Sequence, residues 1–130
     1  MILETDVSEK IIVTGFVDRN KALSYLKCID IFVISSFHDG CPNSMLEAML
    51  AERAIIATNV DGMRDVLTHN QNAILVNPDS HQELLEALYK LINEPAIRQK
   101  LGVAAKKRAL RDFNLNIEAE IWRNLYQYFI

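Results

Sequence analysis

The stretch Ser35–Met49, which reads SSFHDGCPNSMLEAM, joins an apolar run to an amphipathic one. The apolar run before it, Asp30–Ile34, is typical of a short buried strand. Inside the stretch, Pro42 is followed by Asn43 and Ser44, which are helix-start signals, and we expect one of these two polar residues to be the N-cap. The stretch therefore predicts a strand, a loop and a helix in that order.

Two acidic residues occupy fixed places in this unit. Asp39 falls in the loop at the carboxyl end of the predicted strand, and Glu47 falls one to two turns into the predicted helix. In an open α/β sheet, ligands bind at the carboxyl ends of the strands. The two acids are therefore candidate binding residues.

Strand-like and helix-like patterns alternate up to about residue 78. Helical spacing of apolar residues predicts helices over 22–29 and 45–50 and one helical turn at 63–67. The near-continuous apolar character of the predicted strands favours a parallel sheet covered on both faces, which is an α/β, Rossmann-like arrangement. The predicted strands are Lys10–Phe16, Ile31–Ser35, Ala54–Thr58 and Ala73–Val76.

From residue 80 onwards the pattern is helical. Ser80 and Glu83 match a capping box at the start of a helix. Pro95 ends that helix, because the residue before a proline avoids the α region, and two further helices follow. We therefore expect one domain over 1–130, with strands and helices to about 78 and a helical tail over 80–130.

Composition excludes several classes of protein. A net charge of -3 over 130 residues gives no general attraction to nucleic acid. Cys28 and Cys41 are too few for a disulfide scaffold, and their spacing gives no metal motif, so we expect reduced thiols, a cytoplasmic location and no metal. The basic residues of the second tail helix usually form a solvated face, with a peripheral contact to an anionic membrane as the alternative. These residues are Lys106, Lys107, Arg108 and Arg111.

Six segments in a fixed order carry a family resemblance: Thr14–Val17, Asp30–Val33, Asp39–Met49, Ile55–Thr58, Asp61–Gly62 and Asn72–Pro78. Together they resemble the nucleotide-sugar-binding, C-terminal half of the retaining GT-B glycosyltransferases, in the group 1, family 4-like set. The specific signature is a pair of acids separated by seven residues, with Gly-x-Pro after the first acid and Ala-Met after the second. The resemblance covers essentially the whole chain.

The resemblance implies a role for each residue of the motif. Asp39 would contact hydroxyls of the donor sugar, and Glu47 would bind the ribose. Carboxylates suit this task because each can accept two charge-assisted hydrogen bonds. Backbone amides would meet the sugar and the diphosphate, and the predicted strand end would face the base. The amides are those of Gly40, Cys41, Asn43 and Ser44, and the strand end is Gly15, Phe16 and Val17.

Simpler interpretations of the same residues stay open. Ser44 and Glu47 form a capping box in their own right, and Asp39-Gly40 alone is a common turn. The resemblance gives no certain catalytic residue. The sequence contains no D-x-D motif, the metal-binding signature of the other major glycosyltransferase fold, so we expect neither an obligatory metal nor another cofactor.

Several positions depart from the family pattern. The first acid is usually Glu, so Asp39 is one methylene shorter. Glu52-Arg53 stands where a helix-ending Gly-x is usual, and we therefore expect this helix to end by another geometry. Asp61-Gly62 replaces a Gly-Gly pair, and Arg64-Asp65 replaces Pro-Glu.

The resemblance also implies parts that this sequence does not show. Relatives carry an N-terminal acceptor domain and two earlier β-α units with an Arg/Lys pair that neutralises the diphosphate. We therefore expect a chain that is truncated on its N-terminal side and is inactive alone. The missing part would be an acceptor domain or a separate subunit. The open edges of the predicted strand Ile11–Gly15 could also pair in a homo-oligomer. The expected function is donor binding in a retaining glycosyltransferase. The alternative is a degenerate, non-catalytic domain that acts as a binding or partner subunit.

Overall fold

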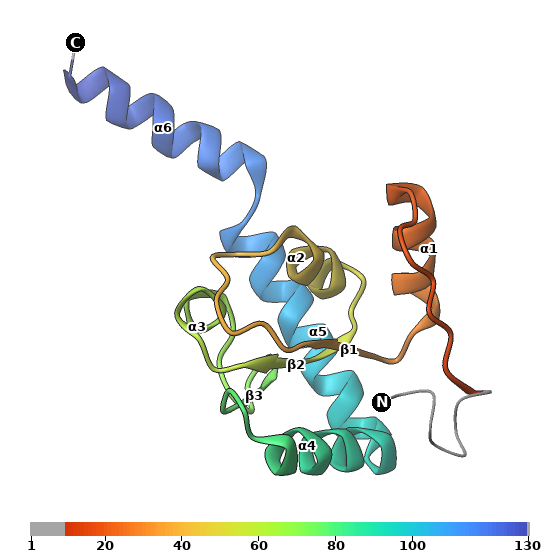
Figure 1. The fold of residues 1–130 in the computed structure, drawn as a ribbon. Helices are drawn as coiled ribbons and strands as arrows, with labels where there is room; N and C mark the ends of the chain where they lie inside the picture. Colours follow the sequence, from red (N-terminus) through yellow and green to blue (C-terminus); the bar gives the residue numbers. More distant parts are fainter. Residues whose placement is uncertain (1–9, 130) are drawn as a thin grey trace.

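A computed structural model describes residues 10–129, with side chains up to Gln127. Helices and strands alternate as far as β3, and the described chain after β3 is helical (Figure 1). The elements are α1 (Arg19–Cys28), β1 (Ile31–Ile34), α2 (Asn43–Leu50), β2 (Ala54–Thr58), α3 (Asp61–Val66), β3 (Ile74–Val76), α4 (His81–Asn93), α5 (Pro95–Asp112) and α6 (Leu115–Phe129).

The three strands form one parallel sheet in the order β1-β2-β3. Ile31 of β1 pairs with Ala54 of β2, and Thr58 of β2 pairs with Val76 of β3. All five residues of β2 are buried, as expected for the central strand of a sheet covered on both faces. The predicted α/β class and parallel sheet are confirmed.

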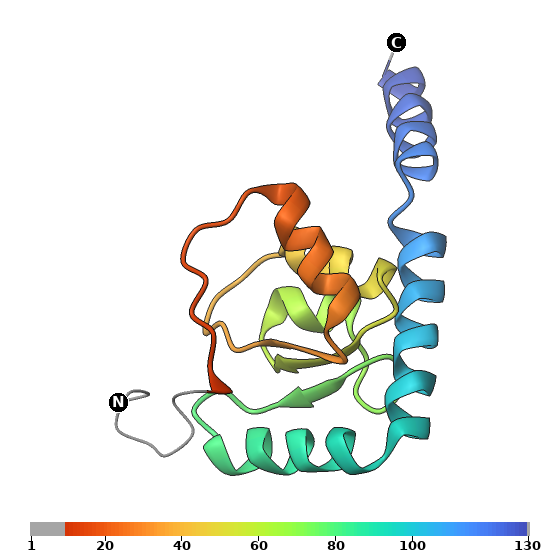
Figure 2. The ribbon, with the colours of Figure 1, turned by 90° about the vertical axis from the view of Figure 1, so that its right-hand side faces the viewer.

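Alternate residues of β2 enter two separate cores. Ile55 and Ala57 pack with α2, α3 and the buried side of α5, where Met45, Met49 and Met63 are fully buried. Ile56 packs on the other face with residues of α4 and α5, including Leu91 and Leu101. Figure 2 shows α4 beneath the sheet and α5 running past its side. The helices α4 and α5 are thus part of the core.

The strand predicted over Lys10–Phe16 is wrong. Apart from Lys10, in a 3₁₀ turn, this segment is irregular in the structure, and it lies outside the sheet (Figures 1 and 2). Its apolar side chains point into solvent, and Phe16 is 99% exposed. A strand gains its stability from the hydrogen-bond ladder and from cross-strand packing, and neither is available to this segment in the structure. The same apolar pattern that predicts a strand therefore leaves an extended, exposed segment.

The end of α2 also differs from expectation. The amide of Glu52 donates to the carbonyl of Met49, and the amide of Arg53 donates to the carbonyl of Ala48, both at 3.0 Å. This pair of bonds is the Schellman motif, in which the residue after the C-cap is usually glycine. Glu52 takes that place with φ of 58°. The expected change of geometry is therefore wrong: the helix ends as if glycine were present, with Glu52 in the left-handed region.

Contacts from α5 hold this turn in place. A Cβ atom at Gly102 would overlap the carbonyl oxygen of Glu52, so α5 approaches the turn as closely as backbone allows. One turn further on, Lys106 Nζ lies 2.9 Å from a carboxylate oxygen of Glu52. Arg53 adds a hydrogen bond of 2.8 Å to the carbonyl of Ile29, which ties the turn to the start of β1.

The capping box predicted at the start of α4 is half confirmed. Ser80 accepts a hydrogen bond from the amide of Glu83, but the Glu83 carboxylate binds the backbone and side-chain amides of Asn77 at 2.7 and 2.8 Å. These bonds from Asn77 lower the pKa of Glu83. The Glu83 carboxylate therefore ties α4 to Asn77, the residue directly after β3.

The last helix, α6, projects away from the sheet (Figure 2). Its large apolar side chains from Leu115 to Tyr126 are exposed, and Trp122 and Tyr126 lie with ring centroids 6.1 Å apart. In the part of the chain that the structure describes, no helix is long and apolar enough to cross a membrane.

We expect Glu52→Gly to be more stable than Glu52→Ala by about 1–2 kcal/mol, the usual cost of a left-handed conformation for a residue with a Cβ atom. Both variants lose the contact with Lys106, so their difference isolates the backbone effect. Urea unfolding of the two variants measures it. Equal unfolding midpoints would mean that Glu52 is not held in the left-handed region.

Candidate functional site

A cleft of about 630 Å³ opens at the carboxyl edge of the sheet. The loop after β1 forms one wall, and the segment from the end of β2 into α3 forms the other. Parallel strands bring these two segments together because their carboxyl ends share one edge. The lining residues are Phe37, His38, Asp39, Gly40, Asn59, Val60, Asp61 and Arg64.

The two walls are fixed to each other through backbone contacts. The hydroxyl of the buried Thr58 donates to the carbonyl of Ser36. A Cβ atom at Gly62 would overlap the carbonyl oxygens of Gly40 and Asp39. Only glycine allows α3 to approach the loop so closely. The position of Asp39 relative to α3 is therefore set by backbone contact, and only the Asp61-Gly62 motif in the sequence hints at it.

The N-terminus of α2 is open. The helix begins at Asn43 with Pro42 as N-cap, and no side chain caps it. The expectation that Asn43 or Ser44 is the cap is therefore wrong: Pro42 has no amide to satisfy, its φ of -68° suits the entry to a helix, and its carbonyl accepts from the amide of Met45 at 3.0 Å. Side chains cap α1 and α4, whereas α3 and α5, like α2, have no side-chain cap. The first amides of α2 are left for another acceptor.

Glu47 faces α1. Its carboxylate accepts a hydrogen bond from an Nη atom of Arg19 at 3.2 Å, with the Glu47 side chain 24% and the Arg19 side chain 79% exposed. The capping box of Ser44 and Glu47 is not formed, because Ser44 is already the second residue of the helix. Since Arg19 opens α1 directly after Gly15–Val17 and Asp18, the ion pair links α2 to the segment predicted to face the base.

The predicted site residues therefore fall into two groups on either side of the α2 N-terminus. Asp39 and Gly40 line the cleft, whereas Glu47 lies outside its lining, on the side of α1. Asn43 and Ser44 are exposed at the start of α2 between them. Arg19 was not anticipated, because its contact with Glu47 crosses 28 residues of sequence.

The surroundings of Cys41 disfavour its thiolate form. Burial, reinforced by the carboxylates of Asp39 and Asp65, raises the pKa of the Cys41 thiol. A thiol with a raised pKa has little of the nucleophilic thiolate at neutral pH. Cys41 therefore contributes its backbone and shape to the loop.

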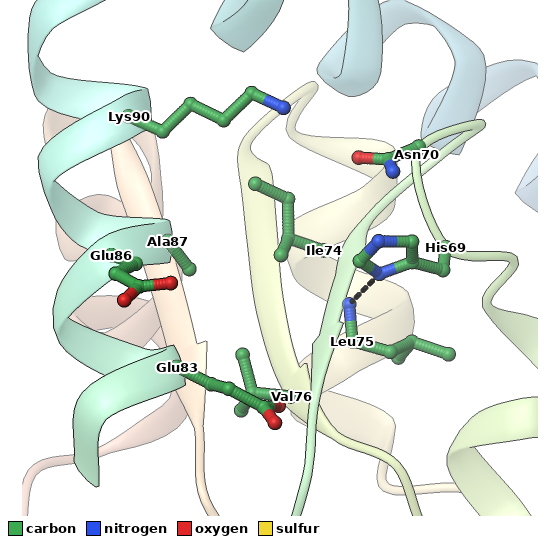
Figure 3. Close-up of a pocket in the computed structure, with 9 residues that line it drawn as sticks. All are labelled: His69, Asn70, Ile74, Leu75, Val76, Glu83, Glu86, Ala87 and Lys90. Atoms are coloured by element: carbon green, nitrogen blue, oxygen red, sulfur yellow. Dashed lines mark hydrogen bonds between the residues drawn. The ribbon is translucent and has the colours of Figure 1, made fainter. Parts of the chain in front are cut away.

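A second pocket, of about 380 Å³, lies between β3 and α4. Figure 3 shows Glu83, Glu86 and Lys90 on the α4 side and His69 on the far side of β3, where its Nδ1 accepts a hydrogen bond from the amide of Leu75 at 3.0 Å. None of the residues predicted to contact the nucleotide-sugar lines this pocket. Among the residues that the structure describes, no group of three or more His, Cys, Asp or Glu side chains is placed to hold a metal ion.

The chain is an α/β protein with a parallel sheet, and the open carboxyl edge of this sheet carries a loop and the uncapped start of a helix. Residues 1–108 match the family described as Glycosyl transferases group 1, and the chain belongs to this family. The "Uncharacterized glycosyltransferase MJ1069" of Methanocaldococcus jannaschii is 30% identical over 115 residues, which are 88% of this chain and 29% of the relative. The chain thus spans under a third of that relative.

Solved structures give the same fold. The C-terminal domain of the glycosyl transferase group 1 family protein LpcC from Francisella tularensis has a TM-score of 0.80 at 27% identity, over 88% of this chain and 59% of that one. Anabaena Alr3699/HepE, solved in complex with UDP-glucose, has a TM-score of 0.73 at 21% identity, over 79% of this chain and 29% of that one. The chain therefore has the Rossmann-like fold of the GT-B glycosyltransferases and corresponds to part of their C-terminal half.

The placement of Asp39 beside Cys41 can be tested by thiol chemistry. With Cys28 changed to Ser, we expect Asp39→Asn to speed alkylation of Cys41 at pH 7.5 by about twofold to fivefold, because removing a nearby negative charge lowers the thiol pKa. Asp30→Asn, at the opposite end of β1, is the charge-matched control. Equal rates for Asp39→Asn and its parent would show that the carboxylate does not lie near the thiol.

We expect Gly62→Ala to destabilise the chain by about 1–3 kcal/mol, the usual cost of inserting a methyl group into a tight contact. Gly40→Ala should cost less, because a Cβ atom at Gly40 would meet open space. Chemical unfolding of both variants measures the difference. Similar losses of stability in the two would contradict the close approach of α3 to the loop.

Proposed function

We propose that this chain is the donor-binding part of a retaining glycosyltransferase and that it holds a nucleotide-diphospho-sugar at the carboxyl edge of its sheet. The observation that carries the proposal is the uncapped start of α2, with Asp39 in a cleft on one side and Glu47 on the other. The group 1 family membership and the UDP-glucose complex of HepE support it.

The diphosphate is assigned to the start of α2. Unsatisfied amides and the helix dipole favour a negative charge at this point. The amides of Asn43 and Ser44 open the helix, and those of Gly40 and Cys41 lie in the loop that leads into it. When the glycosyl bond breaks, negative charge grows on the diphosphate, so the same amides would stabilise the leaving group.

The sugar and the nucleoside are assigned to opposite sides of that helix. Asp39 would accept hydroxyl hydrogen bonds from the donor sugar, directly or through a water where its short side chain does not reach. Glu47 would accept the ribose hydroxyls in place of Arg19. The base would then lie towards Gly15, Phe16 and Val17, which directly precede α1.

The chemistry assigned to this chain is binding, orientation and leaving-group stabilisation. No covalent nucleophile is assigned, and the proposal includes no metal or cofactor. The raised pKa of the Cys41 thiol disfavours a thiolate nucleophile in the loop. The acceptor would bind to the acceptor domain of the complete enzyme or to a separate subunit. We propose that the transfer retains the anomeric configuration of the donor sugar and that the acceptor is supplied in this way.

Titration calorimetry with UDP, GDP, ADP and UDP-glucose tests the proposal. We expect Glu47→Ala to weaken nucleotide binding by about 1–3 kcal/mol, the cost of losing a charged hydrogen bond. Arg19→Ala is the matched control, because it breaks the same ion pair but keeps the carboxylate, so it should not weaken binding. Equal affinities of the wild type and Glu47→Ala would remove the ribose role and leave the ion pair with Arg19 as the function of Glu47.

A further inference from the structure

Arg64 is the only Lys or Arg among the residues that line the 630 Å³ cleft. It lies in α3 and forms an ion pair with Asp61, three residues earlier. Its side chain is 52% exposed, and the Asp61 carboxylate is almost fully exposed. An ion pair so open to solvent is weak, so the guanidinium can exchange Asp61 for an incoming anion.

The backbone beneath Arg64 is rigidly placed. Met63, the residue before it, is fully buried in the core. Gly62 packs directly on the carbonyl of Gly40. The Cα atom of Arg64 is therefore fixed relative to the loop that carries Asp39, while its side chain can move within the cleft.

The charges of the cleft are mixed. Asp39 lies on one wall, and Asp61 and Arg64 lie side by side on the other. Carboxylates repel an anionic ligand but accept hydroxyl hydrogen bonds, whereas a guanidinium binds carboxylate or phosphate oxygens through a planar, bidentate contact. This combination fits a ligand with both hydroxyls and an anionic group.

Arg64 also departs from the motif that this chain otherwise resembles, since Arg64-Asp65 stands where Pro-Glu is usual. A proline at this position would present no charge and no donor to the cleft. The substitution thus adds a cation to the wall opposite Asp39. The positive charge in the cleft is therefore a property of this chain that the shared motif does not supply.

We propose that Arg64 is a specificity-determining residue that binds an anionic oxygen of the donor, either on the diphosphate or on a carboxylate of the sugar. The inference rests on the proposed donor-binding function. Arg64 moves from Asp61 to the ligand, so Asp61 holds the guanidinium ready when the cleft is empty. Binding to the diphosphate and binding to a sugar carboxylate can be told apart by comparing ligands that share a nucleotide and differ in the sugar.

The test compares UDP, UDP-glucose and UDP-glucuronate by calorimetry with the wild type, Arg64→Gln, Arg64→Lys and the charge control Lys100→Gln on α5. We expect Arg64→Gln to weaken binding at least tenfold, Arg64→Lys to recover part of the loss, and Lys100→Gln to have no effect. A loss shared by all three ligands assigns Arg64 to the diphosphate. A loss confined to UDP-glucuronate assigns it to the sugar carboxylate.

Unfolding of Arg64→Gln in urea shows whether the fold is kept, as expected for a half-exposed side chain. If all three affinities stay within twofold of the wild type, the inference is overturned while the proposed function stands. If the wild type binds none of the three ligands and neither GDP nor ADP, the proposed function is lost and the inference falls with it.

Discussion

The structure depends on the burial of β2 between two parallel neighbours and two layers of helix. Its five residues are buried, and their alternation divides the molecule into two cores. The register on both sides places the last residues of all three strands at one edge, where Ile34 pairs with Ala57 and Thr58 pairs with Val76. Because Thr58 is held there, its hydroxyl can bind the carbonyl of Ser36 and fix the path of the loop that carries Asp39.

Two glycines secure the ends of this strand. Before β2, Gly102 of α5 packs on the carbonyl of Glu52, and after β2, Gly62 of α3 packs on the carbonyl of Gly40. In each case a helix touches a loop through backbone atoms, which cannot change rotamer. The loops at both ends of the central strand are thereby held by backbone contact with a helix.

Predictions from sequence succeeded where a segment supplies its own burial signal. The apolar runs of β1, β2 and β3 lie together in the sheet, and they were predicted to within a residue of each end. The segment Lys10–Phe16 has the same signal but no neighbouring strand, so pattern alone was misleading. The Glu52 turn and the contacts of Arg19 and Gly62 were missed for another reason: each depends on backbone conformation or on partners many residues away. The sequence predicts that Asp39 lies in a loop and Glu47 in a helix, but it does not predict that Asp39 lines the cleft or that Glu47 pairs with Arg19.

The candidate site combines a fixed backbone with side chains that can exchange partners. The amides of α2 and the loop are placed by the packing around β2. The acids and arginines around them are paired at the surface, Glu47 with Arg19 and Asp61 with Arg64, and each arginine is at least half exposed. Exposed pairs contribute little stability, so both pairs can open at small cost when a ligand binds. In the proposed complex, Arg64 binds an anionic oxygen of the ligand, Glu47 accepts its hydroxyl hydrogen bonds, and Arg19 is released to solvent.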